Sequence, residues 1–235
     1  MSSTILITGA SRGLGLELTR HFLGQQCHVY AGARDASSRA LQDLRQQYPS
    51  TLTIVALDVT DQQSIDTAAN AVGDACDGLD ICINNAAIST SERFGTLETL
   101  NFAEAQALYD TNALGPLRVA RAFLPLLQRG SSPVIVNVSS EAGQIAQNPR
   151  DGEFEYCMSK AALNMATHLL SRRLKGVGIR VLALHPGWIR TDMGGQDACG
   201  DPGEAAAALA SVICVHRTDL DGHVFFDWQG GRMNW

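Results

Sequence analysis

The sequence has no long run of basic residues and no long run of apolar residues. Among its 235 residues, 18 are Lys or Arg and 24 are Asp or Glu, which gives a net charge of −6, and the longest basic run is Arg172-Arg173. Binding to nucleic acid needs a concentrated basic patch that neutralises phosphates, so we expect no nucleic-acid partner. The apolar runs are too short to cross a membrane, and no basic stretch leads into an apolar one at residues 1–4. We therefore expect no membrane partner and a cytoplasmic location.

Patterns of cysteine and histidine that bind metals are also lacking. The six cysteines are scattered along the chain without a C-x-x-C pair, and no histidine lies at a spacing that would complete a zinc site. Cysteine is among the residues most often found in protein interiors, so we interpret these six as buried free thiols. We expect no metal centre.

The order of apolar segments predicts one α/β domain over residues 1–235. Short runs rich in β-branched residues alternate with longer segments whose apolar residues recur every three or four positions. We predict strands at residues 4–8, 28–31, 52–57, 80–84, 134–139, 179–184 and 223–226, and helices at residues 14–24, 37–48, 62–72, 102–128, 156–175 and 203–212. This alternation is typical of a doubly wound parallel sheet, here of about seven strands, with helices on both faces. Such sheets bind ligands at the carboxyl ends of their strands, so the residues just after each strand are the candidates for chemistry.

The turn after the first predicted strand has the glycine spacing of a dinucleotide-binding site in a Rossmann-type fold. Residues 8–15 read TGASRGLG and lead into the first predicted helix. Glycines allow a tight turn and a close approach to a pyrophosphate, and free N–H groups at the helix start bind the anion. One alternative is a plain glycine-rich turn. Another is the nucleophile elbow of a hydrolase, since residues 9–13 match G-x-S-x-G, but the short upstream segment leaves no room for the loop that supplies the oxyanion donor.

The end of the second predicted strand indicates NADP(H) as the cofactor. A carboxylate there would bond the 2′-hydroxyl of an NAD ribose, but the sequence has Ala33 and then Arg34, whose guanidinium matches a 2′-phosphate in charge and geometry. Arg12, within the glycine turn, supplies a second cation. The alternative is that Arg34 only pairs with Asp35.

Tyr156 and Lys160 are four residues apart and therefore share one face of a predicted helix. The chain has only two lysines and four tyrosines, so this pattern is not expected by chance. A cation close to a tyrosine stabilises the phenolate and brings the pKa of the phenol toward the working range of a general acid. The alternative is a solvated helix face without chemistry.

Together these motifs resemble the short-chain dehydrogenase/reductase family over nearly the whole chain. Besides the glycine turn and Tyr156 with Lys160, the similarity rests on groups in matching order and spacing, namely Asp58-Val59, Asn84-Asn85-Ala86-Ala87, Asn112, Ser139-Ser140 and Pro186-Gly187 leading to Thr191. The segment ALHPGWIRTDMGG and the short carboxyl tail most resemble the branch that contains sniffer-type carbonyl reductases and C-factor-like proteins.

The resemblance implies an oxidoreductase in which Tyr156 donates a proton to a carbonyl oxygen while NADPH delivers hydride to the carbon. It implies that Lys160 bonds the nicotinamide ribose and lowers the pKa of the phenol, that Ser140 holds the substrate oxygen, and that Asn112 supports a water relay to Lys160. The implied catalytic residues are thus Tyr156, Lys160, Ser140 and Asn112. The residues implied to bind NADP(H) are Gly9, Ser11, Arg12, Leu14, Gly15, Arg34, Asp58, Val59, Asn85, Ala86, Ala87, Tyr156, Lys160, Pro186, Gly187, Ile189 and Thr191.

The segments around the site predict a small or planar carbonyl substrate, such as an aldehyde, ketone or quinone. Residues 188–203 take the place of the family's substrate lid and are short and glycine-rich, so we expect an open pocket. Trp188 either walls this pocket or packs in the core. The gap between Ser140 and Tyr156 is longer than the family's commonest pattern, and we expect residues 148–152 to form a bulge that borders the pocket.

Assembly and class of function each have two interpretations. The resemblance implies a homodimer or homotetramer that uses the helices at 102–128 and 156–175, with Leu163, Ala166, Leu169 and Leu170 as candidate contacts, and the alternative is a single chain. For function, the alternative to a carbonyl reductase is a dinucleotide-binding signalling or regulatory protein of the C-factor type with little or no turnover. The complete set of catalytic residues favours the enzyme.

Overall fold

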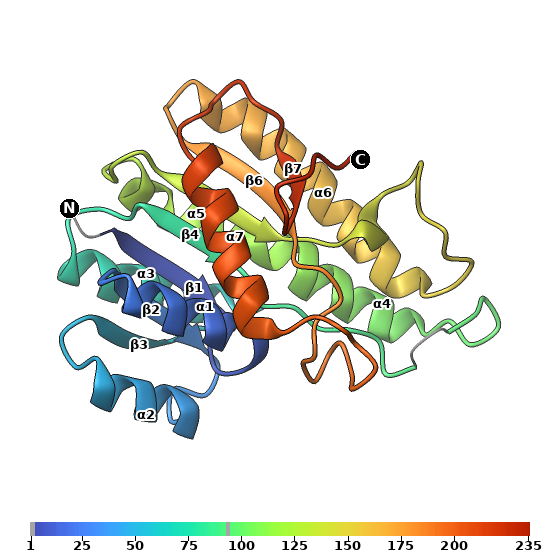
Figure 1. Cartoon of the computed structure of the whole chain (residues 1–235), viewed down its shortest axis with the longest axis horizontal. Helices are drawn as coiled ribbons and strands as arrows, with labels where there is room; N and C mark the ends of the chain where they lie inside the picture. Colours follow the sequence, from blue (N-terminus) through green and yellow to red (C-terminus); the bar gives the residue numbers. More distant parts are fainter. Residues whose placement is uncertain (1–2, 93–94) are drawn as a thin grey trace.

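The computed structural model describes residues 3–92 and 95–235, and within them it has one sheet of seven parallel strands (Figure 1). The strands are β1 (Thr4–Thr8), β2 (His28–Ala33), β3 (Leu52–Ala56), β4 (Ile81–Asn84), β5 (Val134–Val138), β6 (Arg180–His185) and β7 (Phe225–Asp227). They lie in the order β3-β2-β1-β4-β5-β6-β7. The chain reverses its direction across the sheet between β1 and β4, and such a switch point opens a crevice at the carboxyl ends of the strands. The predicted Rossmann-type sheet is confirmed.

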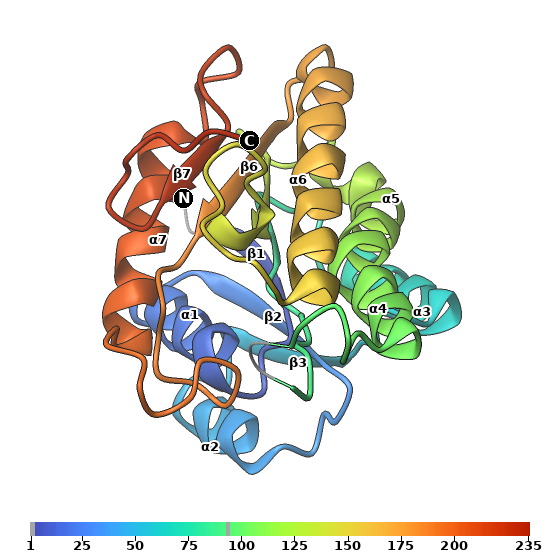
Figure 2. The ribbon, with the colours of Figure 1, turned by 90° about the vertical axis from the view of Figure 1, so that its right-hand side faces the viewer.

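Helices cover both faces of the sheet (Figure 2). On one face lie α1 (Gly13–Gly24), α2 (Arg39–Gln47) and α7 (Pro202–His216). On the other lie α3 (Gln62–Ala75), α5 (Gly115–Leu127) and α6 (Phe154–Lys175), and α4 (Phe102–Tyr109) packs against α6. Each crossover from one strand to the next parallel strand passes through at least one of these helices or a long loop, as parallel pairing requires.

The central strands are mostly apolar because their residues alternate between two hydrophobic cores. In β1, Ile5 and Ile7 join the core beneath α1, α2 and α7, whereas Leu6 joins the core beneath α3 and α5. None of the three has exposed surface. Burial of one such side chain contributes roughly 1.5–3 kcal/mol. A strand with a core on each face needs no polar residues, which explains the unbroken apolar runs in the sequence.

The helix predicted at residues 102–128 is confirmed in its extent, but it is not α-helical throughout. After α4 ends at Tyr109, a π-helical turn covers Asp110–Leu114 and α5 then begins at Gly115. Asn112 lies in this wider turn and pairs with the backbone of Ile88: its Oδ1 accepts the N–H and its Nδ2 donates to the carbonyl oxygen, both at 2.9 Å. The side chain of Asn112 thus joins the π-helical turn to a segment far away in the sequence, a contact that the spacing of apolar residues does not reveal.

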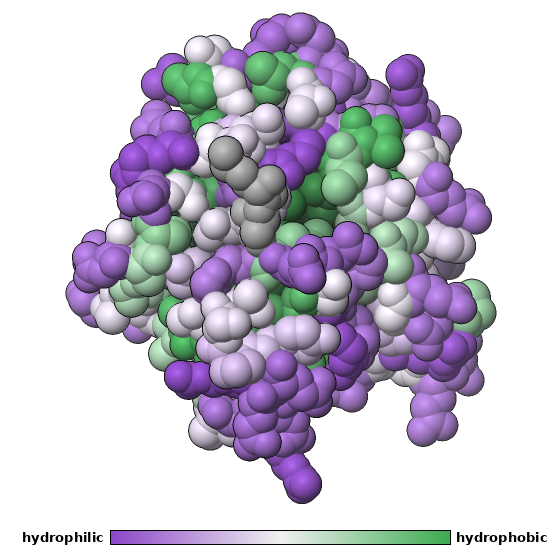
Figure 3. Space-filling model, turned by 60° about the vertical axis from the view of Figure 1, so that its left-hand side comes forward, coloured by the Kyte–Doolittle hydropathy of each residue, from purple (hydrophilic) through white to green (hydrophobic). Residues whose placement is uncertain are grey.

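The surface is mixed. On the face in Figure 3, hydrophilic residues predominate and hydrophobic ones form small separate groups. Among the described residues, no helix has the length and apolar character needed to span a membrane.

The six cysteines are free, but only Cys82 is fully buried, and Cys199 and Cys214 are exposed. The prediction of buried thiols was wrong for these two, because Cys199 lies in a loop and Cys214 on the outer side of α7.

Candidate functional site

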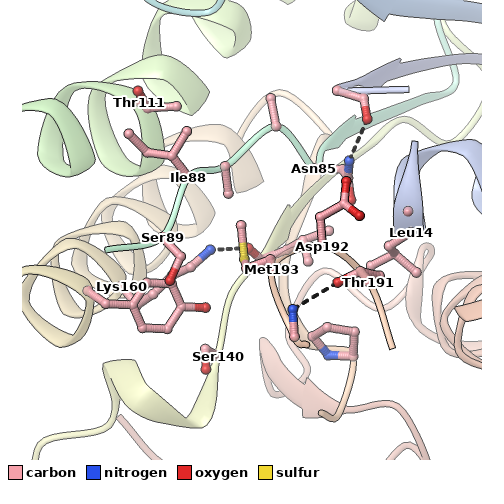
Figure 4. Close-up of a pocket in the computed structure, with 18 of the residues that line it drawn as sticks. Leu14, Asn85, Ile88, Ser89, Thr111, Ser140, Lys160, Thr191, Asp192 and Met193 are labelled. Carbon is pink, nitrogen blue, oxygen red and sulfur yellow. Dashed lines mark hydrogen bonds between the residues drawn. The ribbon is translucent and has the colours of Figure 1, made fainter. Parts of the chain in front are cut away.

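A cavity of about 970 Å³ lies at the carboxyl ends of the strands. Its walls come from the glycine turn after β1, from the segments that follow β2 to β6, and from the first turns of α6. Figure 4 shows Leu14 and Thr191 on one side of the cavity and Ser89, Ser140 and Lys160 on the other. The volume is at the upper end of the range for ligand pockets. All the catalytic and cofactor-binding residues predicted from the sequence line this cavity except Gly15 and Asn112.

The glycine turn is tightly packed, and its backbone takes conformations that favour glycine. Gly9 and Gly13 have φ of +66° and +54°. A Cβ on Gly9 would lie 2.8 Å from the Cα of Ala86, and a Cβ on Gly15 would lie 2.2 Å from the carbonyl oxygen of Gly9. Gly15 thus packs beneath the turn and does not face the cavity. Its role is to let α1 approach β1 closely.

The start of α1 is suited to an anion. Arg12, at the N-cap, makes no side-chain capping hydrogen bond, so the first N–H groups of the helix are not covered by a cap. These groups carry the positive end of the helix dipole and face the side where a phosphate binds in such turns. The side chain of Arg12 extends outward and forms an ion pair with Asp192, and both side chains are mostly exposed.

Arg34 lies on the cavity wall and is not engaged with Asp35 in the described part of the chain. The carboxylate of Asp35 accepts hydrogen bonds from the backbone N–H and the hydroxyl of Ser37 instead. Burial would raise the pKa of Asp58, but hydrogen bonds from Thr60 and the charge of Arg34 outweigh burial and lower it. Arg34 and Arg12 thus both line the cavity, and two cations fit a ligand with an extra phosphate.

Tyr156 and Lys160 project into the cavity from α6. Lys160 is only 3% exposed, its Nζ donates a hydrogen bond to the carbonyl oxygen of Val138 at 3.0 Å, and it lies 5.7 Å from the centre of the Tyr156 ring. Burial lowers the pKa of Lys160 to about 8 and raises the pKa of Tyr156 to about 12. In the protein alone, burial therefore outweighs the lowering of the phenol pKa that the resemblance implies. At neutral pH Tyr156 is a phenol and Lys160 a cation.

Ser140 and Asn112 lie in different surroundings. Ser140 follows β5 and lines the cavity, and its side chain opposes the rise in the pKa of Tyr156 that burial causes. Asn112 is 1% exposed and lies behind the wall, where its Nδ2 also donates to the hydroxyl of Ser159 at 3.0 Å. The side chain of Asn112 thus connects Ile88, which lines the cavity, to Ser159, which directly precedes Lys160 on α6.

Three charged or titratable groups beside Ser140 were not predicted from the sequence, namely Glu141, Arg150 and His185. Nη2 of Arg150 lies 2.6 Å from Oε1 of Glu141, and Nδ1 of His185 lies 3.2 Å from Oε2 of Glu141 without the geometry of a hydrogen bond. Glu141 directly follows the serine pair and His185 ends β6, and these positions at the carboxyl ends of strands are the signal that could have identified them. The predicted bulge is confirmed, since Arg150, Asp151 and Gly152 line the cavity.

Trp188 walls the cavity and is not part of the core. It is 46% exposed, lines the cavity, and its Nε1 donates to the carbonyl oxygen of Gly194 at 2.8 Å. The segment that follows folds back on itself, because Gly200 donates its N–H to Trp188 and accepts the N–H of Arg190, both at 2.9 Å. These backbone hydrogen bonds therefore join the two ends of the short segment at residues 188–200.

Comparisons with known proteins agree with this arrangement. A family model described as short chain dehydrogenase matches residues 3–199. The chain is 39% identical over 161 residues to the C-signal of Myxococcus xanthus, which covers 68% of this chain and 95% of that protein. The NADPH-bound carbonyl reductase from chicken fatty liver has a TM-score of 0.88 at 34% identity, covering 100% of this chain and 99% of that one. The carbonyl reductase Sniffer of D. melanogaster has a TM-score of 0.92 at 29% identity, covering 100% of both chains. With its glycine turn, Tyr156 and Lys160 at one cavity, the chain belongs to the short-chain dehydrogenase/reductase family.

Proposed function

We propose that the protein is an NADPH-dependent carbonyl reductase that converts an aldehyde, ketone or quinone to an alcohol, with Tyr156 as the general acid. The observation that carries the proposal is that Tyr156, Lys160 and Ser140 line the same cavity as the glycine turn and Arg34. The similarity to the NADPH-bound carbonyl reductase from chicken fatty liver supports it.

The cofactor would lie along the carboxyl ends of the strands and, when bound, supplies hydride to the substrate carbon. The glycine turn and the start of α1 would bind its pyrophosphate, and Arg12 and Arg34 its 2′-phosphate. Asp58 and Val59 would contact the adenine, and residues 85–87 the adjoining ribose. The nicotinamide end would meet Lys160 and the segment after β6, which includes Pro186, Gly187, Ile189 and Thr191.

The protein would contribute placement and a proton. Tyr156 is protonated at neutral pH, as the acid of a reduction must be, and its pKa of about 12 reflects burial. Ser140 would lie against the substrate oxygen beside Tyr156. We assign Asn112 to holding Ile88 and the π-helical turn in place next to Lys160, where a water relay to that lysine would run.

The direct test is consumption of NADPH by the purified protein against quinones, diketones, aldehydes and ketones, with NADH in parallel and the alcohol identified by mass spectrometry. We expect turnover with NADPH and little with NADH. Turnover with NADH alone, or hydrolysis of an ester panel without any NADPH consumption, would contradict the proposal.

A second candidate is a nucleotide-dependent signalling protein, since the similarity to the C-signal covers 95% of that protein. The intact set of Tyr156, Lys160 and Ser140 at the cavity favours the enzyme. Tight binding of NADPH without turnover of any carbonyl, together with a biological effect that persists in Tyr156→Phe, would favour the signalling protein over the enzyme.

We also propose that two or four copies assemble through α4 and α6. These neighbouring helices expose large apolar side chains, namely Phe102, Tyr109, Met158, Met165 and Leu169. The prediction that Leu163 contacts another copy was wrong, because this residue is only 1% exposed and is buried within the fold. Light scattering after size exclusion would measure the mass, and a particle of 25.1 kDa would contradict the assembly.

A further inference from the structure

We propose that Arg150 determines which carbonyls the site accepts: its guanidinium joins Glu141 to Glu153 and thereby fixes the bulge at residues 148–152 as a wall that excludes bulky substrates. The consequence for specificity rests on the proposed reductase function, but the state of the bulge can be measured without turnover.

The bulge lies between the two parts of the chain that carry Ser140 and Tyr156. After the 3₁₀ turn at Glu141–Gly143, residues 144–153 form no helix or strand before α6 begins. Residues 150–153 nevertheless line the same cavity as Ser140 and Tyr156. A segment without the backbone bonds of a helix or sheet opens easily unless other contacts hold it. Its position therefore depends on side-chain contacts.

Arg150 binds a carboxylate at each end of this segment. Its Nη2 donates to Oε1 of Glu141 at 2.6 Å, and its Nε donates to Oε2 of Glu153 at 2.8 Å. Burial would lower the pKa of Arg150, but the hydrogen bonds and charges of the two carboxylates outweigh burial and raise it. Hydrogen bonds between ions are stronger than those between neutral groups, and the planar guanidinium fixes their directions. One side chain of the bulge thus joins the segment after β5 to the start of α6.

Glu141 is itself held by the residues around Ser140. Its Oε2 accepts the hydroxyl of Ser140 at 2.6 Å and lies 3.2 Å from Nδ1 of His185. The Oγ of Ser140 in turn accepts the backbone N–H of Ala142 at 3.1 Å. Arg150 therefore connects the bulge to a carboxylate that contacts the residue expected to hold the substrate oxygen.

Glu153 takes a backbone conformation that favours glycine, with φ of +54° and ψ of +42° directly before α6. This left-handed region is disfavoured for residues with a Cβ. The side chain of Glu153 is only 14% exposed, and its backbone N–H donates to the carbonyl oxygen of Gly95 at 2.8 Å. A glycine here would relax the backbone but would lose the ion pair with Arg150.

Asn148 holds the other end of the bulge by hydrogen bonds that do not involve the guanidinium. Its Nδ2 donates to the carbonyl oxygen of Ala142, and its Oδ1 accepts the backbone N–H of Arg150, both at 3.0 Å. A substitution of the Arg150 side chain leaves these two bonds in place. Such a variant should therefore loosen the end of the bulge without unfolding the protein.

The bulge limits the space beside the reacting groups. The substrate carbonyl would lie against Ser140 and Tyr156, and its other atoms would meet residues 150–153 of the wall. The wall can move back only if Arg150 breaks its charge-assisted hydrogen bonds. A small carbonyl requires no such movement and a bulky one does, so removal of the guanidinium should favour bulky substrates.

The first test measures the bulge by amide hydrogen exchange and mass spectrometry. Arg150→Met removes both ion pairs and keeps an unbranched side chain, and Arg150→Lys keeps the charge without the planar fork. We expect the peptide at residues 144–153 to exchange at least about fivefold faster in both variants than in the wild type.

The matched control is Arg217→Met. Arg217 also joins separate segments, because its Nη2 donates to the carbonyl oxygens of Ser131 and Ser132 at 2.7 and 3.0 Å. These residues precede β5 and lie at the opposite end of the sheet from the cavity. This variant should leave both the exchange of the bulge and the preference among carbonyls unchanged.

The second test compares kcat/KM with NADPH for 3,5-diethoxybenzaldehyde and benzaldehyde. The ratio of the bulky over the small aldehyde should rise at least about fivefold in Arg150→Met, with a Kd for NADPH near that of the wild type. A purely structural role would lower both values alike and leave their ratio unchanged.

Wild-type exchange of the bulge in Arg150→Met, or faster exchange with an unchanged ratio, would overturn the inference. Arg150→Lys with wild-type exchange and ratio would also contradict the role of the planar guanidinium. If neither the wild type nor any variant reduces a carbonyl, the proposed function fails and the specificity role fails with it. Hydrogen exchange would then still decide whether Arg150 fixes the bulge.

Discussion

Replacing Lys160 with methionine should stabilise the cofactor-free protein. Lys160 is 3% exposed, and burial lowers its pKa from 10.5 to about 8. This depression corresponds to about 3 kcal/mol of unfavourable free energy for the buried cation at pH 7. Methionine removes that cost but leaves the carbonyl oxygen of Val138 without its donor, a loss of about 1 kcal/mol. The net gain is about 2 kcal/mol, or a rise in Tm of about 5 °C for a chain of this length.

The gain should depend on pH in a defined direction. The unfolded chain holds the lysine proton more tightly than the folded protein does, so the wild type gains stability as pH rises from about 8 to 10.5. The advantage of Lys160→Met should therefore fall from about 2 kcal/mol at pH 7 to near zero at pH 10.

The assay is urea unfolding followed by circular dichroism at both pH values. Lys175→Met is the control, because Lys175 is exposed and pairs with Asp221 at the surface, where such pairs contribute about 0–1 kcal/mol. The reasoning would be refuted if the free energy of unfolding of Lys160→Met were lower than that of the wild type at pH 7. It would also be refuted if the gain in stability were the same at both pH values.

Three further changes test other parts of the site. Arg34→Asp removes a charge-assisted contact to a 2′-phosphate and adds repulsion, so the ratio of kcat/KM for NADPH over NADH should fall by at least about tenfold; an unchanged ratio would remove Arg34 from the cofactor site. Gly9→Ala places a side chain at φ +66° and 2.8 Å from Ala86, so unfolding experiments should show a loss of at least about 1–2 kcal/mol, and a wild-type midpoint would contradict this conformation. Asn112→Ala leaves the N–H and carbonyl of Ile88 unpaired, which should cost about 2–4 kcal/mol; a loss below 1 kcal/mol would mean that water or another group replaces the side chain.

The sheet and the cofactor turn were predictable because their signals are local. Ile5-Leu6-Ile7 is apolar throughout since its two faces meet two cores, and the glycines of the turn are spaced for one strand-to-helix connection. Tyr156 and Lys160 were predictable for the same reason, because residues four apart on a helix meet whatever the rest of the fold does.

The parts that were missed depend on contacts between distant segments. Glu141, Arg150 and His185 meet only after β5 and β6 lie side by side and the bulge folds over them. Asn112 in the π-helical turn pairs with Ile88, 24 residues earlier. No periodicity within one segment contains this information.

The most direct test of the account is the comparison of wild type and Tyr156→Phe with NADPH and the best carbonyl substrate. Phenylalanine keeps the ring and removes the proton that the reaction needs, while the glycine turn and Arg34 remain. We predict that Tyr156→Phe binds NADPH with an affinity near that of the wild type and loses at least about 100-fold in kcat. A variant that binds NADPH and keeps the wild-type kcat would contradict Tyr156 as the acid and, with it, the central claim.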